Sequence, residues 1–225
     1  MDNAAGAAPA PAQPDPGPAV KFPTLIRGDA RIGIYGGMFD PIHLGHMAVA
    51  REALSELWLE HLFFIPAFQA PLRSTPAGAP AEDRLDLVRR AVAEAGNPKM
   101  QVLDLEVRAG RVCYTVDTVR QLQAVWPRAR MVLIMGSDQF AHLAQWVEPQ
   151  ALAKMVEFAV FDRPGLAPSA PPPTLLRVLQ MRRLSIVQHP ANATEIRRRL
   201  KVGRKVDEWL PRSVAAAIEE KKLYR

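Results

Sequence analysis

Two histidines three residues apart, His43 and His46, stand in the stretch GIYGGMFDPIHLGH at residues 33–46. Imidazoles at this spacing could bind a metal ion, act as an acid–base pair, or donate hydrogen bonds to an anion. A zinc ion held by protein needs three or four ligands, and no third ligand follows nearby. The spacing also differs from the common helical pair, i and i+4. We therefore expect no metal bound by the protein itself.

The residues around this pair favour phosphate as the anion. Gly36 and Gly37 let a ligand approach the backbone, and the histidines fall where a helix is expected to begin. A helix N-terminus attracts anions because its N–H groups lack partners and its dipole is positive there. A purely structural alternative remains open, in which the glycines make a tight turn and His43 caps the helix.

Alternating strands and helices must position this stretch. Short apolar runs predict strands, and apolar residues at helical spacing predict the helices between them. The expected strands are residues 31–36, 61–66, 100–105, 130–136, 157–161 and 184–188. The expected helices are residues 43–58, 82–96, 115–126, about 149–156, 193–203 and 211–222. This alternation predicts an α/β fold: a doubly wound, Rossmann-like parallel sheet in three layers, forming a single domain.

Three polar motifs follow predicted strands. They are GGMFDPIHLGH, the GSD of residues 136–138 and the ATEIR of residues 193–197. Doubly wound folds bind ligands beyond the carboxyl ends of their strands, where the strand order reverses. The sequence therefore predicts that the three motifs form one site at that edge.

Composition also indicates the domain organisation and the compartment of the protein. Residues 1–28 are rich in Ala and Pro without apolar periodicity, so we expect a disordered leader and a domain spanning residues 29–225. The leader lacks the features of a secretory or mitochondrial targeting signal, and no window of about 20 residues is apolar enough for a membrane span. A cytoplasmic protein without a membrane partner is expected. The single Cys113 excludes an internal disulfide.

The net charge of +6 and the pI of about 9.8 suit anionic partners, either nucleic acids or phosphate-bearing small molecules. Much of this charge lies in the arginine-rich segment of residues 197–205. Aromatic residues that would stack on bases are not interleaved with it. We therefore expect no nucleic-acid partner.

The stretch GGMFDPIHLGH resembles the GG-x-FDP-x-H-x-GH signature of the HxGH nucleotidyltransferase superfamily. Within it, Arg31–Arg225 resembles the bacterial nicotinate-nucleotide adenylyltransferases. The motifs that carry this narrower resemblance are FIPAFQAPLR at 64–73, YTVDT at 114–118, GSD at 136–138, Trp146, RPG at 163–165, ATEIR at 193–197 and the terminal LYR. The resemblance implies an enzyme of NAD biosynthesis that joins AMP from ATP to nicotinate mononucleotide and releases pyrophosphate.

The resemblance also implies roles for individual residues. The acceptor's phosphate is itself the attacking group, so catalysis rests on positioning and charge stabilisation. Catalytic residues would be His43, His46 and Arg197. ATP would be bound by Gly36, Gly37, His43, His46, Gly136, Asp138, Thr194 and Arg197, and nicotinate mononucleotide by Phe39, Arg73, Tyr114, Thr115 and Trp146. Mg²⁺ would be carried mainly by the ATP phosphates.

The sequence departs from the family pattern in two places. Leu72 replaces the histidine of a PPH loop, and Asn192 and Ala193 replace serines of the last motif. Asn192 can still cap the following helix, with Glu195 as its partner. A sibling enzyme acting on nicotinamide mononucleotide or another phosphate ester such as phosphopantetheine remains an alternative, as does a non-catalytic nucleotide sensor. Formation of a homo-oligomer is left open.

Overall fold

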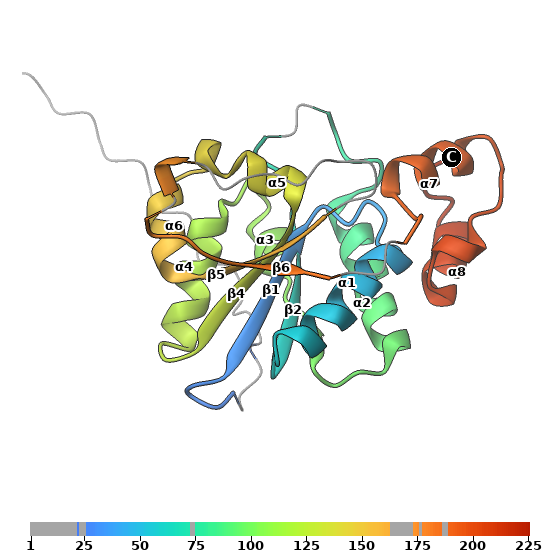
Figure 1. The fold of residues 1–225 in the computed structure, drawn as a ribbon. Coiled ribbons are helices and arrows are strands. Elements are labelled where there is room, and N and C mark those ends of the chain that lie inside the picture. Colours follow the sequence, from blue (N-terminus) through green and yellow to red (C-terminus); the bar gives the residue numbers. More distant parts are fainter. Residues whose placement is uncertain (1–21, 23–25, 73–74, 163–172, 176, 186–188) are drawn as a thin grey trace, which may run out of the picture.

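The computed structural model describes residues 22, 26–72, 75–162, 173–175, 177–185 and 189–225 (Figure 1). The RPG motif, Arg73 and nearly all of the expected leader lie outside these residues. No helix in the described ranges is both long and apolar enough to cross a membrane.

Within the described residues, six strands form one sheet in the order β3-β2-β1-β4-β5-β6. The strands are β1 Arg31–Gly37, β2 His61–Pro66, β3 Met100–Val102, β4 Arg130–Gly136, β5 Glu157–Phe161 and β6 Gln180–Leu184. Every neighbouring pair is parallel. The order reverses between β1 and β4, which lie side by side at the centre. The predicted doubly wound parallel sheet is confirmed.

Helices cover both faces of this sheet (Figure 1). One face carries α1 Leu44–Glu56, α2 Ala81–Ala95, α7 Ala193–Lys201 and α8 Arg212–Glu220. The other carries α3 Leu105–Ala109, α4 Thr115–Val125, α5 Ser137–Ala141 and α6 Pro149–Met155. Short 3₁₀ turns occur at η1 Leu143–Gln145, η2 Pro173–Leu175 and η3 Asp207–Trp209. The result is the expected three-layer arrangement.

The strands β1, β2, β4 and β5 are buried on both faces, so their side chains alternate between two cores. On β4, Val132 and Ile134 join the core beneath α1, α2 and α8. Leu133 and Met135 join the opposite core, beneath α4 and α6. Burial on both faces explains why these strands have near-continuous apolar sequences.

Two predicted strands differ from the structure. The strand expected at 100–105 ends at Val102, and Leu105 begins helix α3. Leu103, Leu105 and Val107 alternate as in a strand, yet all three are buried, and Leu103 and Leu105 belong to the core beneath α4. Alternation alone could not distinguish this short helix from a longer strand.

The strand expected at 184–188 lies at Gln180–Leu184 instead, and residues 186–188 lie outside the described ranges. This edge strand is mostly polar, so an apolar run does not mark it. Arg182 pairs with Glu157 at 2.9 Å and Arg183 with Asp162 at 3.0 Å. Charged side chains are common on edge strands because they discourage pairing with other chains.

Candidate functional site

The candidate site lies beyond the carboxyl ends of β1 and β4, where the strand order reverses. The loop after β1 carries the two histidines, and α5 follows β4 directly. Gly136 is the N-cap of α5, and Asp138 lies in the first turn rather than at the cap. Parallel strands point their carboxyl ends the same way, so the structure brings the first and second polar motifs to one edge.

His43 and His46 form a stacked pair at the start of α1. His43 is the N-cap residue and is only 7% exposed. Its backbone N–H donates to Nδ1 of His46 at 3.2 Å. The two rings lie 3.7 Å apart between centroids, at an interplanar angle of 28°. Because Nδ1 of His46 accepts a hydrogen bond, the neutral ring carries its proton on Nε2, which is therefore a donor.

Phe39 supports this pair from the core side. Its ring is 3% exposed and packs edge-on against His46 with centroids 5.1 Å apart. It also packs edge-on against Tyr35 at 5.5 Å. The φ angle of Phe39 is 44°, a left-handed conformation that is costly for a non-glycine residue and needs support from its surroundings. Its side chain therefore belongs to the floor of the loop.

The glycines of the loop differ in what they permit. A Cβ at Gly36 would meet only a carbonyl oxygen 4.0 Å away, and one at Gly37 would meet the Phe39 ring at 3.5 Å. Neither residue has a positive φ. Packing within the chain thus does not require glycine at these positions, whereas close approach of a ligand would.

Gly45 is different, because the chain itself leaves no room there. A Cβ at this position would lie 3.0 Å from the His43 ring and 3.2 Å from the carbonyl oxygen of Ala191. The start of α1 and the segment before α7 are therefore in close contact. Two helix N-termini, those of α1 and α7, meet at the histidine loop.

The third motif is tied to the first through Arg197. Nη1 of Arg197 donates to the backbone carbonyl of Asp40 at 2.6 Å and lies 3.6 Å from its carboxylate. Nη2 of Arg197 donates to Thr194 at 3.4 Å. The Asp40 carboxylate, 2% exposed, accepts from the backbone N–H of Gly78 at 2.8 Å. The structure thus joins His43, His46, Thr194 and Arg197 into one arrangement.

Helix α7 begins as the sequence predicts. The side chain of Asn192 accepts from the backbone N–H of Glu195 at 2.8 Å, which confirms it as the N-cap. The Glu195 carboxylate pairs with Arg198 at 2.6 Å and Arg199 at 3.0 Å, and these hydrogen bonds lower its pKa to about 2. The arginine run is therefore divided: two members bind Glu195, and Arg197 faces the histidine loop.

Sequence reasoning missed Arg84, which anchors the loops of the site. Its buried guanidinium donates to the carbonyls of Met38 at 2.6 Å, Ala67 at 2.8 Å, Phe68 at 2.8 Å and Ala79 at 3.2 Å. These carbonyls belong to the loop after β1 and to the segment between β2 and α2. The available signal was its place on α2, where it precedes Val88 and Ala91 on the apolar stripe.

Three of the residues expected to bind the acceptor lie in the other helical layer. Tyr114 is the half-exposed N-cap of α4, Thr115 is its first residue, and Trp146 follows η1 and packs against the core beneath α4. Behind them, Thr118 donates to Glu106 at 2.8 Å. Burial raises the pKa of Glu106 to about 7, against the opposing effect of that hydrogen bond.

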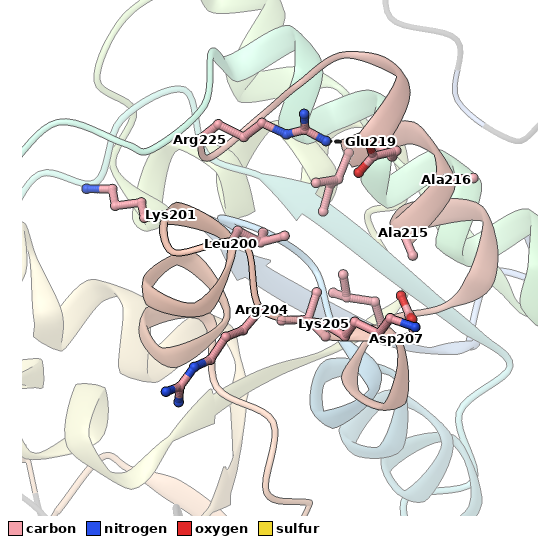
Figure 2. Close-up of a pocket in the computed structure, with 13 residues that line it drawn as sticks. Leu200, Lys201, Arg204, Lys205, Asp207, Ala215, Ala216, Glu219 and Arg225 are labelled. Atoms are coloured by element: carbon pink, nitrogen blue, oxygen red, sulfur yellow. Dashed lines mark ion pairs between the residues drawn. The ribbon is translucent and has the colours of Figure 1, made fainter.

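A hollow of about 700 Å³ between α7 and α8 is separate from these residues (Figure 2). The apolar residues Leu200 and Ala215 and the basic residues Lys201, Arg204 and Lys205 are among those that line it. None of the predicted site residues that the structure describes lines it. The described residues also contain no group of three His, Cys, Asp or Glu side chains placed to hold a metal ion.

The parallel sheet with a histidine loop at its point of reversal defines a class, the nucleotidyltransferases of α/β fold. A sequence profile described as cytidylyltransferase-like matches residues 34–199, more than half of the chain. The chain is also 37% identical over 199 residues to a "Probable nicotinate-nucleotide adenylyltransferase" of Bordetella avium, covering 87% of this chain and 98% of the relative. The like-named protein of Thermus thermophilus is 37% identical over 195 residues, covering 87% and 100%. The chain belongs to the cytidylyltransferase-like family and, within it, to the nicotinate-nucleotide adenylyltransferases.

A solved structure shares the fold. Plasmodium falciparum nicotinic acid mononucleotide adenylyltransferase complexed with NaAD matches with a TM-score of 0.67 at 16% identity, covering 87% of this chain and 97% of that one. At this identity the match speaks for the fold. The family resemblance predicted from the motifs is confirmed by the sequence relatives.

Proposed function

We propose that the protein transfers AMP from ATP to nicotinate mononucleotide, giving nicotinate adenine dinucleotide and pyrophosphate, as a step of NAD biosynthesis. The observation that carries this proposal is the hydrogen bond from Arg197 of α7 to the Asp40 carbonyl, in the loop that leads to the His43–His46 pair. It stands in a chain whose relatives bear the name of this activity.

The arrangement suits a triphosphate. The N-termini of α1 and α7 supply a positive potential, and Nε2 of His46, the Thr194 hydroxyl and the Arg197 guanidinium supply donors. Gly36 and Gly37 leave the backbone open to the ligand. We assign the α-phosphate to the histidines and the β- and γ-phosphates to Thr194 and Arg197.

The reaction needs no nucleophile from the protein. An oxygen of the mononucleotide phosphate attacks the α-phosphorus of ATP and forms the new P–O bond. The bond between the α-phosphorus and its bridging oxygen breaks, and the electron pair leaves with pyrophosphate. His46 stabilises the charge at the α-phosphate, and Arg197 stabilises the negative charge that increases on the leaving pyrophosphate. Holding the two phosphates in line provides the rest of the acceleration.

The remaining predicted residues bind the acceptor and the nucleoside of ATP. Tyr114, Thr115 and Trp146 form the nicotinate pocket, with the Trp146 ring stacked on the pyridine. Phe39 shapes the floor between the two substrates, and Arg73 is a cationic partner for the acceptor. The segment from Gly136 to Asp138 binds the ribose or adenine of ATP.

The donor chemistry of the loop fits a magnesium–ATP complex. Imidazole, guanidinium and hydroxyl donors bind phosphate oxygens, and the phosphates then offer the oxygen ligands that Mg²⁺ prefers. Bound in this way, the ion would neutralise phosphate charge. His43, His46, Thr194 and Arg197 hold the phosphates that carry it.

The proposal is tested by pyrophosphate release. Purified protein is incubated with ATP and Mg²⁺, and with nicotinate mononucleotide, nicotinamide mononucleotide, phosphopantetheine or no acceptor. The proposal predicts release that depends on nicotinate mononucleotide and is much slower with the other acceptors. Absence of release with every acceptor would overturn the enzymatic function, and faster release with another acceptor would overturn the assigned substrate.

A further inference from the structure

The end of the chain packs against the candidate site. Tyr224, the penultimate residue, is only 6% exposed and belongs to the core that contains Phe39. A Cβ on Gly78 would lie 2.7 Å from Cδ of Arg197 and 2.9 Å from Cδ1 of Tyr224. The side chains of Tyr224 and Arg197 therefore share the space above this glycine, whose N–H donates to Asp40.

The charges of Asp40, Arg84 and Arg197 act on the Tyr224 phenol. Burial raises the pKa of the Tyr224 phenol above its usual range, and the Asp40 carboxylate beside it adds to this rise. The cations Arg84 and Arg197 are near enough to oppose it. The phenol stays protonated at every physiological pH, so it can donate a hydrogen bond to a buried carboxylate that requires compensation.

We propose that Tyr224 is a positioning residue of the active site, which holds the Asp40 carboxylate so that Arg197 remains directed at the β- and γ-phosphates of ATP. This inference rests on the proposed function. Nη1 of Arg197 lies 3.6 Å from the Asp40 carboxylate, beyond the length of a good hydrogen bond. The carboxylate accepts from the backbone N–H of Gly78, and the buried Tyr224 hydroxyl beside it has no other hydrogen-bond partner among the described residues.

This geometry predicts that loss of the Tyr224 hydroxyl weakens the binding of ATP. Without the phenol, Asp40 is a less compensated buried charge, and its nearest mobile cation is Arg197. The guanidinium is then drawn toward the carboxylate and away from the phosphates. Binding of ATP should weaken, while binding of the mononucleotide, which uses other residues, should change little.

The variant that tests this is Tyr224→Phe, which keeps the buried ring and removes the hydroxyl. The matched control is Arg225→Ala, because Arg225 pairs with Glu219 on the surface at 2.5 Å. Tyr224→Phe should raise the KM for ATP about tenfold, the factor that corresponds to one hydrogen bond to a charged group. The KM for the mononucleotide should stay within about twofold, and Arg225→Ala should match the wild type.

A double-mutant cycle separates positioning from a general structural role. If Tyr224 acts through Arg197, adding Tyr224→Phe to Arg197→Ala should cost nothing further, because interacting residues are not additive. Additive losses, equal changes in both KM values, or a wild-type KM for ATP in Tyr224→Phe would each overturn the inference.

Calorimetric titration with ATP and Mg²⁺ keeps this test independent of turnover. If the wild type binds ATP but releases no pyrophosphate, the proposed function fails, and the ATP affinity of Tyr224→Phe still decides the role of Tyr224. About tenfold weaker binding supports it, and unchanged binding overturns it. A wild type that does not bind ATP overturns both.

Discussion

The backbone N–H of His43 donates to Nδ1 of His46 at 3.2 Å, while the two rings stack at 3.7 Å. This bond assigns different tasks to the two nitrogens of His46. Nδ1 is engaged with the protein, and Nε2 is the donor for a ligand. Each task can be removed separately by substitution.

Replacing His46 with Asn or Gln should distinguish the two nitrogens. The Asn amide can accept from His43 as Nδ1 does, but it does not reach the Nε2 position. The Gln amide reaches that position. We expect His46→Ala and His46→Asn to lower kcat about 10²-fold, and His46→Gln about tenfold, as for loss of a charge-stabilising donor. Steady-state kinetics at saturating substrates would measure this, and the opposite order of Asn and Gln would contradict the assignment.

Gly45→Ala should lower activity without lowering stability. An added Cβ meets the His43 ring at 3.0 Å and the Ala191 carbonyl at 3.2 Å, so the ring must shift. Alanine also favours helix over glycine by about 0.5–1 kcal/mol, which offsets the crowding. We expect kcat/KM to fall about tenfold with a melting temperature near that of the wild type. Ser55→Ala, at the exposed far end of α1, is the control and should leave both unchanged.

Arg84→Met should destabilise the fold strongly. It removes the donor shared by four carbonyls, and unsatisfied buried polar groups are costly. We expect a loss of about 3–5 kcal/mol in the free energy of unfolding, measured by urea denaturation, and a smaller loss for Arg84→Lys.

Arg90→Met is the matched control for Arg84. Arg90 pairs with Asp86 at 3.0 Å on the same helix, where both side chains are partly exposed. Its loss should cost less than about 1 kcal/mol. Equal losses for the two methionine variants would contradict the anchoring role of Arg84.

Glu106 should make stability depend on pH. Burial raises its pKa in the folded chain to about 7 from an ordinary value of 4.5. Between these values the folded chain holds a proton that the unfolded chain has released. The stabilisation from protonated Glu106 is therefore complete below pH 4.5 and is lost as the pH rises through 7.

Glu106→Gln cannot ionise and keeps an acceptor for Thr118. Its stability relative to the wild type should increase by about 1–3 kcal/mol between pH 5 and pH 8. Urea denaturation of both proteins at the two pH values measures this difference. A difference that does not change with pH would show that Glu106 titrates normally.

Much of the fold follows from local sequence, because strands buried on both faces have apolar runs that stand out from the helices between them. The place of the histidine loop, after β1 and before α1, could be predicted from its sequence motif. The shift of the last strand to Gln180–Leu184 could not be predicted, because its ladder is formed by backbone groups and its side chains are mostly polar.

The contacts that hold the site residues in place could not be predicted from the sequence. Arg197 and Asp40 are 157 positions apart, and only the folded chain brings them together. Arg84 is predictable as an arginine on an apolar stripe, but not the four carbonyls that it binds. Tyr224 belongs to a terminal motif whose sequence gives no sign of its contact with Gly78 and Arg197.

A competition between acceptors tests the central claim most directly. The protein is given ATP and Mg²⁺ with equal concentrations of nicotinate mononucleotide, nicotinamide mononucleotide and phosphopantetheine, and the products are quantified by mass spectrometry. Product ratios report the ratios of kcat/KM for the acceptors. The proposed function predicts nicotinate adenine dinucleotide as the main product, by about tenfold or more. A main product from another acceptor, or no adenylylated product at all, would contradict it.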